Sequence, residues 1–500
     1  MTEGRVRLGA ARVQRLDVAA AVVITGVMLA PWAPLATAGL AVGVATAMAC
    51  PLLGLLAAAW AVPFGSAAAL PMGAVALTPA PVLLALTAFG WALSAAARRR
   101  LPVVPAAGRV VLSGLAVFVA GLALSALAAP DIAAGGAEVV RWGLLGLALA
   151  LAAALGPRRG VVLAVAILAA GAAEAAVGAA MAVQRVGPEA FAVLGGRIYR
   201  AHGTFGQPNP FAGYMNMVWP VGLALAWTAL VGDGARARGG PPRTRLPLGR
   251  GLAVFGAGAA GLCGVALVLS WSRGGWLAAA AGGGTMALAW VARAWGGRVA
   301  RRRSLAVAWA ASTLGVALLL AGAVDRIPAG IGDRLGSISR TFAVWGVADA
   351  EVTDANFATV ERVAHWEAAA AMWAERPWLG HGPGTYAEIY PRFRLPRWSD
   401  PLGHAHNIYL HLLAESGLVG LACYFVFFGA ALAAILRAVW HPTGQFEAAL
   451  GLGLAGVWGA LAFHSLLDNL YVHDMTIHLG LLLGVLSGQR GRAPALGGQG

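Results

Sequence analysis

The chain consists largely of long apolar runs separated by short polar stretches. Of its 500 residues, 59% are hydrophobic and 11% are charged, whereas a soluble domain carries about 25% charged residues. An apolar helix of about 20 residues crosses the hydrocarbon core of a bilayer. The runs are rich in Leu, Ala and Val and do not alternate with polar residues, which favours helices over a β-barrel. We therefore predict an all-α polytopic membrane protein.

A membrane span is predicted wherever an apolar run approaches this length. The region 36–64 is ambiguous, because it fits either two short spans or one re-entrant pair, so about 12 to 14 transmembrane helices are expected. The predicted spans cover residues 17–34, 36–50, 51–64, 79–97, 109–128, 139–156, 160–183, 211–231, 251–270, 275–292, 305–323, 408–436, 446–465 and 474–488.

The positions of the basic residues predict the orientation. All 36 of them are arginine, and short cytoplasmic loops are enriched in such residues. If the N-terminus is cytoplasmic, most arginines fall in cytoplasmic loops, and the segments 184–210, 270–276 and 324–407 face outward. The pI of about 11.2 would suggest nucleic acid for a soluble protein. Here the arginines follow the membrane topology instead, so no nucleic-acid partner is expected.

The spans and loops predict three regions. Residues 1–323 form N-terminal transmembrane helices, 324–407 form a long extracytoplasmic loop, and 408–500 form C-terminal transmembrane helices with a short cytoplasmic tail. Within the loop, apolar residues recur at helical spacing over 358–375, and Pro377 ends the pattern, because proline stops helices. We expect a helix that lies over the membrane face.

Two outward arginines are candidates for binding an anion. Arg200 precedes a run of glycines and prolines that marks a fixed turn into the span 211–231, for which Asn209 is a candidate N-cap. The ordinary alternative for Arg200 is an interfacial side chain that reaches the lipid headgroups. Arg273 lies in SWSRGGW, in a short outer turn where arginine is unexpected, and a charge at such depth usually has a role. Gly274 and Gly275 would let the backbone approach a ligand closely.

Four histidines lie near the outer end of the span 408–436, and neutral histidine can accept a hydroxyl proton as a general base. Packing and metal chelation by His404 and His406 are the alternatives. The nearby acidic residues lack firm ligand spacing, and the cysteines lie inside apolar runs, so no metal is expected. The four histidines are His381, His404, His406 and His411.

Several other residues border these candidates. Arg362 lies on the predicted loop helix, and the segment GHGPG at 380–384 fits either a tight turn or a phosphate-cradling loop, the second being a weak match. Arg392, Arg394 and Arg397 form a basic stretch that is either a solvated face or a surface for a polyanionic glycan. Another group follows the span 446–465 and could border a site: Asp468, Asn469, His473 and Asp474.

Taken together, these segments resemble the O-antigen ligase superfamily, which includes Wzy-type polysaccharide polymerases and protein O-oligosaccharyltransferases. The resemblance covers residues 190–440 approximately. In its last segment, His406, Asn407, Leu410 and Gly417 fit the family's spacing of His-Asn, Leu and Gly. The segments that carry the resemblance are GTFGQPNPFAGY at 203–214, SWSRGGWLA at 270–278, Arg362 with Trp366 and PWLG at 377–380, and HAHNIYLHLLAESGLVG at 404–420.

The resemblance implies a GT-C-like membrane transferase. Such an enzyme moves a glycan from an undecaprenyl-diphosphate donor to a hydroxyl of a lipid, glycan or protein acceptor, at the outer face of the bacterial cytoplasmic (inner) membrane. Its partners are these substrates and membrane lipids, without a cofactor or metal. By the same resemblance, Arg200 and Arg273 would bind the diphosphate and His406 would be the base. The candidate accessory residues are Arg362, His404 and Asn407.

Three alternatives remain open at this stage. His404 could be the base in place of His406. A Wzy-type polymerase would share the same motifs as a ligase. A membrane transporter or flippase is the rival from another class, but transporters usually carry charged or broken helices near the midplane. Here the polar residues concentrate at one membrane face, which favours an enzyme acting at the surface.

Overall fold

A computed structural model of the chain describes residues 45, 47–68, 70–72, 75–99, 103–127, 129–231, 249–294, 346–353 and 356–490. The predicted spans 17–34 and 305–323 and most of 36–50 lie outside these residues. The same holds for most of the stretch 232–250 and for the first part of the long loop, 324–345. The chain divides into two compact units, which are described separately.

Within the described residues, nine helices are long and apolar enough to cross a membrane, and two shorter apolar helices accompany them. The prediction of an all-α polytopic membrane protein is therefore confirmed, and every predicted span in these residues corresponds to a helix. The long helices are α4 (Pro79–Arg98), α5 (Ala106–Ala126), α6 (Ile132–Ala154), α7 (Gly156–Gln184), α8 (Pro208–Val231), α9 (Arg250–Leu269), α10 (Arg273–Ala294), α15 (Ile408–Trp440) and α16 (Gln445–His464). The short ones are α3 (Pro51–Phe64) and α17 (Met475–Gly488).

The first unit comprises Met1–Arg109, Leu144–Glu174 and His473–Gly500. In it α3 packs against α4, at a point where a Cβ on Gly54 would overlap the Thr87 hydroxyl. Helix α3 leads through the short 3-10 helix η1 (Gly65–Ala68) into an antiparallel hairpin of β1 (Leu70–Met72) and β2 (Val75–Leu77), in which Leu70 pairs with Leu77. The sequence analysis did not predict this hairpin.

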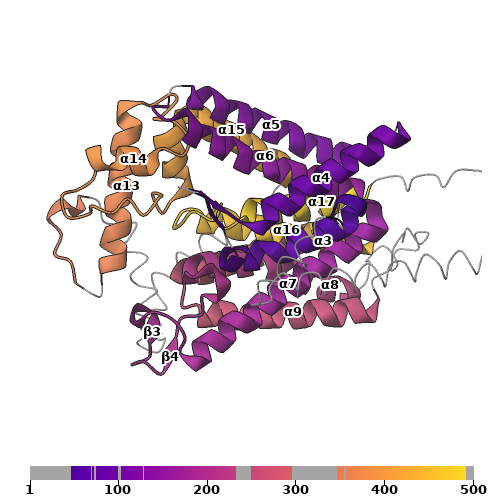
Figure 1. Ribbon diagram of the computed structural model, residues 1–500. Helices are drawn as coiled ribbons and strands as arrows, with labels where there is room; N and C mark the ends of the chain where they lie inside the picture. Colours follow the sequence, from indigo (N-terminus) through magenta and orange to yellow (C-terminus); the bar gives the residue numbers. More distant parts are fainter. Residues whose placement is uncertain are drawn as a thin grey trace, which may run out of the picture. The chain divides into compact units, whose positions relative to one another are not determined.

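The second unit comprises Val110–Gly143 and Ala175–Val472. Its centre is α8, which packs against α9, α10 and α16; Figure 1 shows α8 and α9 running side by side. A Cβ on Gly222 of α8 would lie 2.6 Å from the Gly256 carbonyl oxygen of α9, and one on Gly282 would lie 2.7 Å from the Gly456 oxygen. Small residues let helix backbones approach in a membrane, where van der Waals packing drives association.

The non-membrane part of this unit contains short elements and one long helix. The long helix is α13 (Phe357–Glu375), which confirms the helix expected over 358–375, and Figure 1 shows it with α14 (Tyr386–Ile389) at one end of the unit. A small hairpin, β3 (Ala192–Val193) with β4 (Ile198–Tyr199), precedes α8. The remaining elements are the 3-10 helices η2 (Glu189–Phe191), η3 (Gly203–Phe205), η6 (Val347–Asp349) and η7 (Tyr390–Arg392).

Helix α15 is interrupted at Gly417, whose φ of 61° and ψ of −164° are not helical. The break leaves backbone groups without helical partners, and in an apolar setting such groups must be satisfied. The segment 377–382 satisfies them. The bonds are His381 N–H to Ala414 O (3.0 Å), Gly382 N–H to Glu415 O (2.8 Å), Leu418 N–H to Pro377 O (2.9 Å) and Val419 N–H to Trp378 O (3.1 Å).

The turn that contains GHGPG is fixed to the same break by a carboxylate. The Glu415 side chain accepts hydrogen bonds from the backbone N–H groups of Gly384 and Tyr386, both at 2.9 Å. Gly380, Gly382 and Gly384 all have positive φ, which glycine adopts without strain. The interpretation of this segment as a phosphate-cradling loop is therefore wrong: it is a tight turn, and the anion that its amides bind is the protein's own Glu415.

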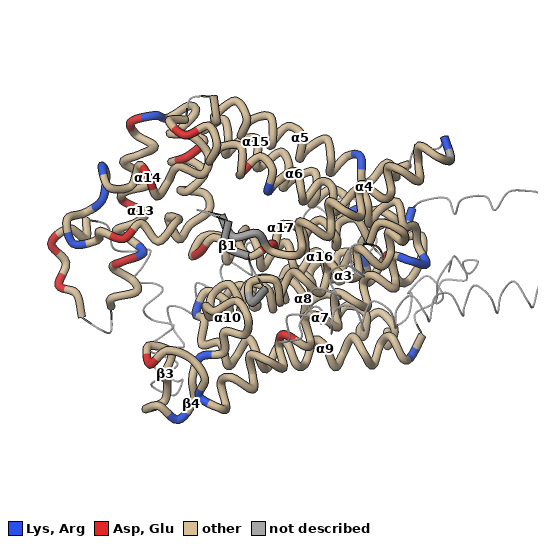
Figure 2. The backbone as a smooth tube through the Cα atoms, viewed as in Figure 1, with Lys and Arg blue, Asp and Glu red and all other residues tan. Residues whose placement is uncertain are grey.

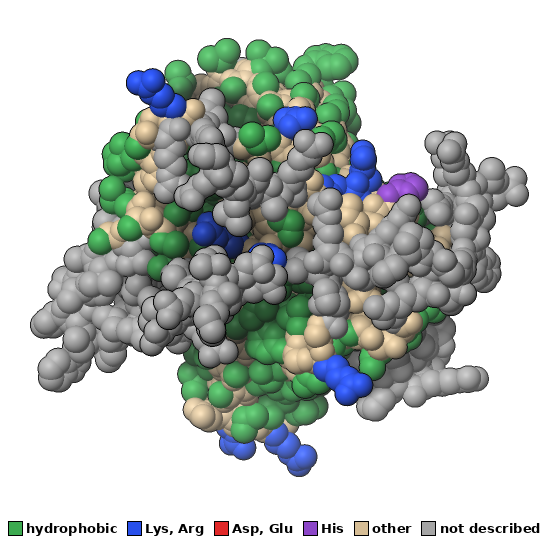
Figure 3. All heavy atoms as spheres, turned by 90° about the vertical axis from the view of Figure 1, so that its right-hand side faces the viewer, with side chains coloured by type: hydrophobic (Ala, Val, Ile, Leu, Met, Phe, Trp, Pro, Cys, Tyr) green, Lys and Arg blue, Asp and Glu red, His purple; other side chains and the backbone are tan. Residues whose placement is uncertain are grey.

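The charged residues of the second unit are unevenly placed. Figure 2 shows its acidic residues mainly around α13 and α14. Arg250 begins α9 and Arg293 lies in the last turn of α10, so the turn that joins these two spanning helices lies at the opposite membrane surface from both. In Figure 3 arginine is the charged residue visible among the hydrophobic side chains of the described part of the chain.

Candidate functional site

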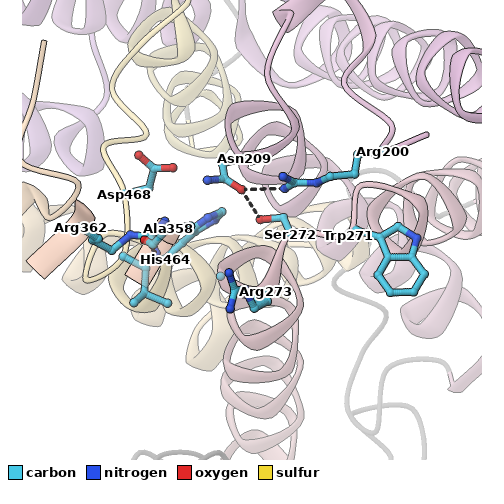
Figure 4. Close-up of a pocket in the computed structure, with 11 residues that line it drawn as sticks. Arg200, Asn209, Trp271, Ser272, Arg273, Ala358, Arg362, His464 and Asp468 are labelled. Atoms are coloured by element: carbon cyan, nitrogen blue, oxygen red, sulfur yellow. Dashed lines mark hydrogen bonds between the residues drawn. The ribbon is translucent and has the colours of Figure 1, made fainter. Parts of the chain in front are cut away.

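A small polar pocket forms where four parts of the second unit meet (Figure 4). These parts are the segment before α8, the turn between α9 and α10, helix α13, and the loop after α16. The cavity has a volume of about 80 Å³. Three arginines and one carboxylate give its lining a formal excess of two positive charges. The lining residues are Arg200, Asn209, Trp271, Ser272, Arg273, Gly274, Ala358, Arg362, His464, Leu467 and Asp468.

Arg200 is held in this pocket by backbone and side-chain contacts. Its guanidinium Nε donates to the carbonyl of Ser270 at 3.0 Å, and one terminal nitrogen donates to Asn209 Oδ1 at 3.4 Å. The next residue, Ala201, bonds through its N–H to the carbonyl of Leu269 at 2.9 Å. A guanidinium fixed in this way lines a defined site, which disfavours the alternative of a side chain that reaches freely to headgroups.

Asn209 joins Arg200 to the turn before α10. Helix α8 begins at Pro208, so Asn209 lies inside the first turn, and its Oδ1 accepts hydrogen bonds from Arg200 and from the Ser272 hydroxyl at 2.9 Å. The prediction that Asn209 caps this helix is therefore wrong. Its side chain instead makes a tertiary contact with Ser272, 63 positions later in the sequence. The residue preferences of helix N-termini do not reveal such a contact.

Arg273 is the first residue of α10. Ser272 precedes it and caps the helix, since its hydroxyl accepts the N–H of Gly275 at 3.2 Å. Trp271, at the centre of the turn, has a φ of 50°, which is uncommon for a residue with a Cβ. The N-terminus of a helix carries partial positive charge and favours anions. The charge of Arg273 and the helix terminus therefore act in the same direction.

The two glycines after Arg273 serve helix packing. A Cβ on Gly275 would lie 2.6 Å from the Cβ of Ala212 in α8, and a Cβ on Gly274 would lie 3.2 Å from the ring of His464. We expected these glycines to admit a ligand to the backbone, whereas the structure gives them a role in helix packing. They allow α10 to approach α8 and α16 closely enough to bring Arg273 to the pocket.

Arg362 reaches the pocket from α13. One terminal nitrogen donates to the carbonyl of Ala358, one turn earlier, at 3.3 Å. Its Nε is buried and has no hydrogen-bond partner within the described residues. Burial lowers the pKa of Arg362, while the charges of Asp468 and Glu361 oppose this shift; arginine nevertheless stays charged in proteins.

His406 is paired with Asp468, one of the residues that the sequence analysis placed at the possible border of a site. Its Nδ1 lies 3.3 Å from Oδ1 of Asp468, and its carbonyl accepts a hydrogen bond from Trp366 Nε1 at 3.3 Å. Burial alone would raise the pKa of Asp468. The hydrogen bond from His406 and the positive charge of Arg362 oppose burial, and the pKa is held well below its usual range. An ionised Asp468 accepts the Nδ1 proton of a neutral His406, which leaves the Nε2 lone pair available.

The pocket does not bring all the predicted site residues together. Arg200, Arg273 and Arg362 line it, whereas His406 does not, although its partner Asp468 does. The base candidate and the arginines are therefore adjacent through Asp468.

His404 lies next to this pair, and its ring proton is on the other nitrogen, Nε2. Its Nδ1 accepts the backbone N–H of His406 at 3.1 Å, so the proton of the neutral ring belongs on Nε2, which lies 3.8 Å from Asp468 Oδ1. Burial lowers the pKa of His404 to about 3, which keeps the ring neutral. One ligand atom each of His404, His406 and Asp468 lies within 4.8 Å of the others, as the metal alternative requires. A metal ion needs the Nε2 lone pair of His404, and this tautomer does not offer it.

Asn407 has a structural task beside the base candidate. It is the N-cap of α15, and its Oδ1 accepts the N–H groups of Tyr409 at 3.0 Å and Leu410 at 3.1 Å. The adjacent Ile408 N–H bonds to the carbonyl of Ser465 at 2.9 Å. These contacts fix the start of α15 against the end of α16, and so place His406 beside Asp468.

The other predicted residues lie elsewhere in the unit. His381 Nε2 contacts the carbonyl of Met372 at 3.0 Å, and His411 Nε2 lies 3.4 Å from Glu415. Arg392 forms an exposed ion pair with Glu375 at 3.1 Å. None of these side chains lines the described pocket. Conversely, His464 lines it although the sequence analysis treated it only as part of a span.

Comparison with known families shows what part of this chain resembles. Residues 258–425 match the family model described as O-Antigen ligase. This segment is similar to the O-antigen ligase family, as the resemblance of the sequence motifs predicted. The matched segment contains Arg273, Arg362 and His406, and the family supports glycan transfer of the ligase or polymerase type. Comparison with curated proteins gave no match. Arg200 and Asp468 lie outside the segment that matches the O-antigen ligase model, and the fold brings them to the residues inside it.

Proposed function

We propose that this O-antigen ligase-like protein transfers a glycan from an undecaprenyl-diphosphate donor to an acceptor hydroxyl at the outer face of the bacterial cytoplasmic membrane. The observation that carries the proposal is the pocket in which Arg200 and Arg273 lie beside Asp468, the hydrogen-bond partner of His406. It combines a site for an anionic leaving group with a general base.

The arginines suit a diphosphate. A diphosphate esterified to both a lipid and a sugar carries two negative charges, which equal the formal excess of positive charge in the pocket lining. Guanidinium groups match phosphate oxygens in two-pronged hydrogen bonds, and the start of α10 adds its dipole. A cavity of about 80 Å³ admits phosphate groups, while the polyprenyl chain and the glycan extend outside it.

His406 suits the proton transfer. Its Nε2 accepts the proton of the acceptor hydroxyl as the hydroxyl oxygen bonds to the sugar C1. The bond from C1 to the phosphate oxygen breaks, the lipid diphosphate leaves with the electron pair, and the configuration at C1 inverts. Asp468 stabilises the imidazolium that forms. Positive charge spreads over C1 and the ring oxygen in the transition state, as in glycoside chemistry, while the arginines stabilise the developing phosphate charge.

The tautomer of His404 favours His406 as the base. The Nδ1 of His404 is occupied by the His406 backbone N–H, so its Nε2 carries the proton and cannot accept another. Within the described residues, the Nε2 of His406 has no hydrogen-bond partner and is free to act. The reaction as written requires no metal or cofactor. Helix α13, in the described part of the long loop, acts as a lid that positions the acceptor.

A Wzy-type polymerase of the same superfamily would use the same residues. It differs only in the acceptor, which is then a second lipid-linked glycan. The product of the reaction therefore distinguishes the two, and glycan length and acceptor identity decide between ligase and polymerase.

The test is a transfer assay in lipid nanodiscs that contain the full chain. An undecaprenyl-diphosphate oligosaccharide is supplied with candidate lipid, glycan and protein acceptors, and release of undecaprenyl diphosphate is measured. Wild type and the exposed control Arg159→Ala should release it, whereas His406→Ala and Arg273→Ala should be slower by about 100-fold or more. Equal rates for all four proteins would overturn the proposal. No release with any acceptor would favour transport, to be followed by flux measurements.

A further inference from the structure

We propose that Arg362 is a third ligand of the donor diphosphate, and that it makes the site select a diphosphate over a monophosphate. This inference rests on the proposed function. Arg362 extends from α13 and lines the same pocket as Arg200 and Arg273, at the side next to His464 and across from Arg200 (Figure 4).

Most N–H donors of the Arg362 guanidinium make no hydrogen bond within the described residues. Its one hydrogen bond in the described residues is a 3.3 Å contact with Ala358 in its own helix, and its buried Nε has no partner. Asp468 makes no hydrogen bond with Arg362 in the described residues, and its Oδ1 accepts instead from His406 Nδ1 and from the Asn469 N–H at 2.9 Å. A half-buried guanidinium whose buried Nε lacks an acceptor is costly unless a ligand supplies one.

The charge balance indicates what that ligand is. With Arg200, Arg273 and Asp468 alone, the lining would have an excess of one positive charge, which suits a lipid-linked monophosphate diester. Arg362 raises the excess to two, which suits a diphosphate. When the bond to the sugar breaks, the leaving diphosphate gains a further negative charge, so Arg362 contributes more to the transition state than to the bound donor.

Arg362 also lies on the face of α13 that holds the base segment. Trp366, four positions later, donates to the carbonyl of His406 at 3.3 Å, and residues four apart lie on the same face of a helix. One face of α13 therefore contacts the phosphate pocket at Arg362 and the base segment at Trp366. A third phosphate ligand at this position sets the distance between the leaving group and the base.

The experiment measures binding and not turnover. The methyl esters of farnesyl diphosphate and of farnesyl monophosphate, which carry two and one negative charges as the lipid-linked sugars do, are titrated into the full chain in nanodiscs by calorimetry. Wild type should prefer the diphosphate by about tenfold or more, since one added charge-assisted contact changes affinity by that order. Arg362→Gln should lose most of this preference while monophosphate affinity changes by less than about twofold. Arg362→Lys should restore part of it, and the exposed Arg397→Gln should match wild type.

The outcomes separate this inference from the proposed function. If Arg362→Gln keeps the wild-type preference while Arg273→Gln loses diphosphate binding, the third-ligand inference is overturned and the proposed function stands. If Arg200→Gln, Arg273→Gln and Arg362→Gln all bind as wild type, the phosphate pocket itself is refuted. Unchanged thermal unfolding of Arg362→Gln ensures that a loss of binding is not a loss of fold.

Discussion

The Nδ1 atom of His406 lies 3.3 Å from Oδ1 of Asp468, a residue 62 positions further along the chain. Asp468 is 4% exposed and also lines the pocket that contains the three arginines. His406 itself has a φ of 50°, a conformation that costs free energy for a residue with a Cβ. This carboxylate therefore connects the arginine-lined pocket to the imidazole and fixes which imidazole nitrogen is free.

Replacing Asp468 by Asn should slow glycan transfer far more than it affects donor binding. The amide keeps the size of the side chain but loses the charge that holds the Nδ1–H tautomer and stabilises the imidazolium. We expect the rate at saturating donor to fall by about 10²–10⁴-fold, the usual contribution of acid–base catalysis. The control is Asp400→Asn, an exposed carboxylate on the long loop that contains His406. Rates within a few-fold of wild type for Asp468→Asn would contradict the pairing.

The membrane helices could be predicted from the sequence because hydrocarbon thickness sets the length of an apolar span. The predicted span 160–183, for example, corresponds to α7 (Gly156–Gln184), and the loop helix 358–375 to α13 (Phe357–Glu375). Arg273 could be identified because arginine is out of place in a short outer turn. In these cases the signal is local, and a window of about 20 residues contains it.

The contacts that complete the site are not local. Arg200 bonds to Ser270 across 70 positions, and His406 to Asp468 across 62, so neither partner could be deduced from its neighbours. The amides of the GHGPG turn bind Glu415, about thirty residues later, and no local pattern shows that this anion belongs to the protein. Asn209 was assigned to a helix cap because helix starts favour asparagine, whereas its oxygen is used by Arg200.

Acid should destabilise the fold through buried neutral histidines. Burial lowers the pKa of His365 to about 4 and of His404 to about 3, below the value near 6.5 of an unfolded chain. Above pH 6.5 neither state binds the proton, so these groups add no pH dependence. Between pH 6.5 and about 4 the unfolded state takes up protons that the folded state refuses, so stability falls as the pH falls.

The measurement is the apparent Tm in nanodiscs from pH 7 to pH 4.5. His365→Gln should shift the proton uptake on unfolding by up to about one proton and flatten the acid slope. The reference is wild type at several pH values. The exposed His441 is not used as a control, because it is the C-cap of α15. A slope of opposite sign, or one that His365→Gln leaves unchanged, would contradict the account.

Replacing Gly417 by Ala should destabilise the second unit. Its φ of 61° and ψ of −164° are accessible essentially to glycine alone, and an added Cβ would lie 2.3 Å from the backbone carbon of Trp378. We expect a loss of more than about 2 kcal/mol, seen as a lower Tm and a loss of transfer. Gly429→Ala, in the same helix with open space around it, is the matched control and should be neutral or slightly stabilising. Equal Tm values for the two variants would refute the role of the break.

Chelators should leave transfer unaffected. The His404 tautomer directs a proton and not a lone pair from Nε2 toward Asp468, so the trio of His404, His406 and Asp468 is set for proton transfer. Activity in EDTA should equal activity in buffer, measured as release of undecaprenyl diphosphate. Loss of activity in EDTA that Zn²⁺ restores in wild type, and fails to restore in His404→Ala, would instead assign a metal to these three residues.

The most direct test of the central claim is a cryo-EM structure of the full chain in nanodiscs with a phosphonate analogue of an undecaprenyl-diphosphate-linked sugar. The account predicts that both phosphorus atoms lie in the pocket, with oxygens in hydrogen-bond contact with Arg200 and Arg273. It also predicts that Nε2 of His406 faces the sugar C1 from the side opposite the leaving oxygen. A diphosphate bound away from these arginines, or a sugar C1 out of reach of His406, would contradict it.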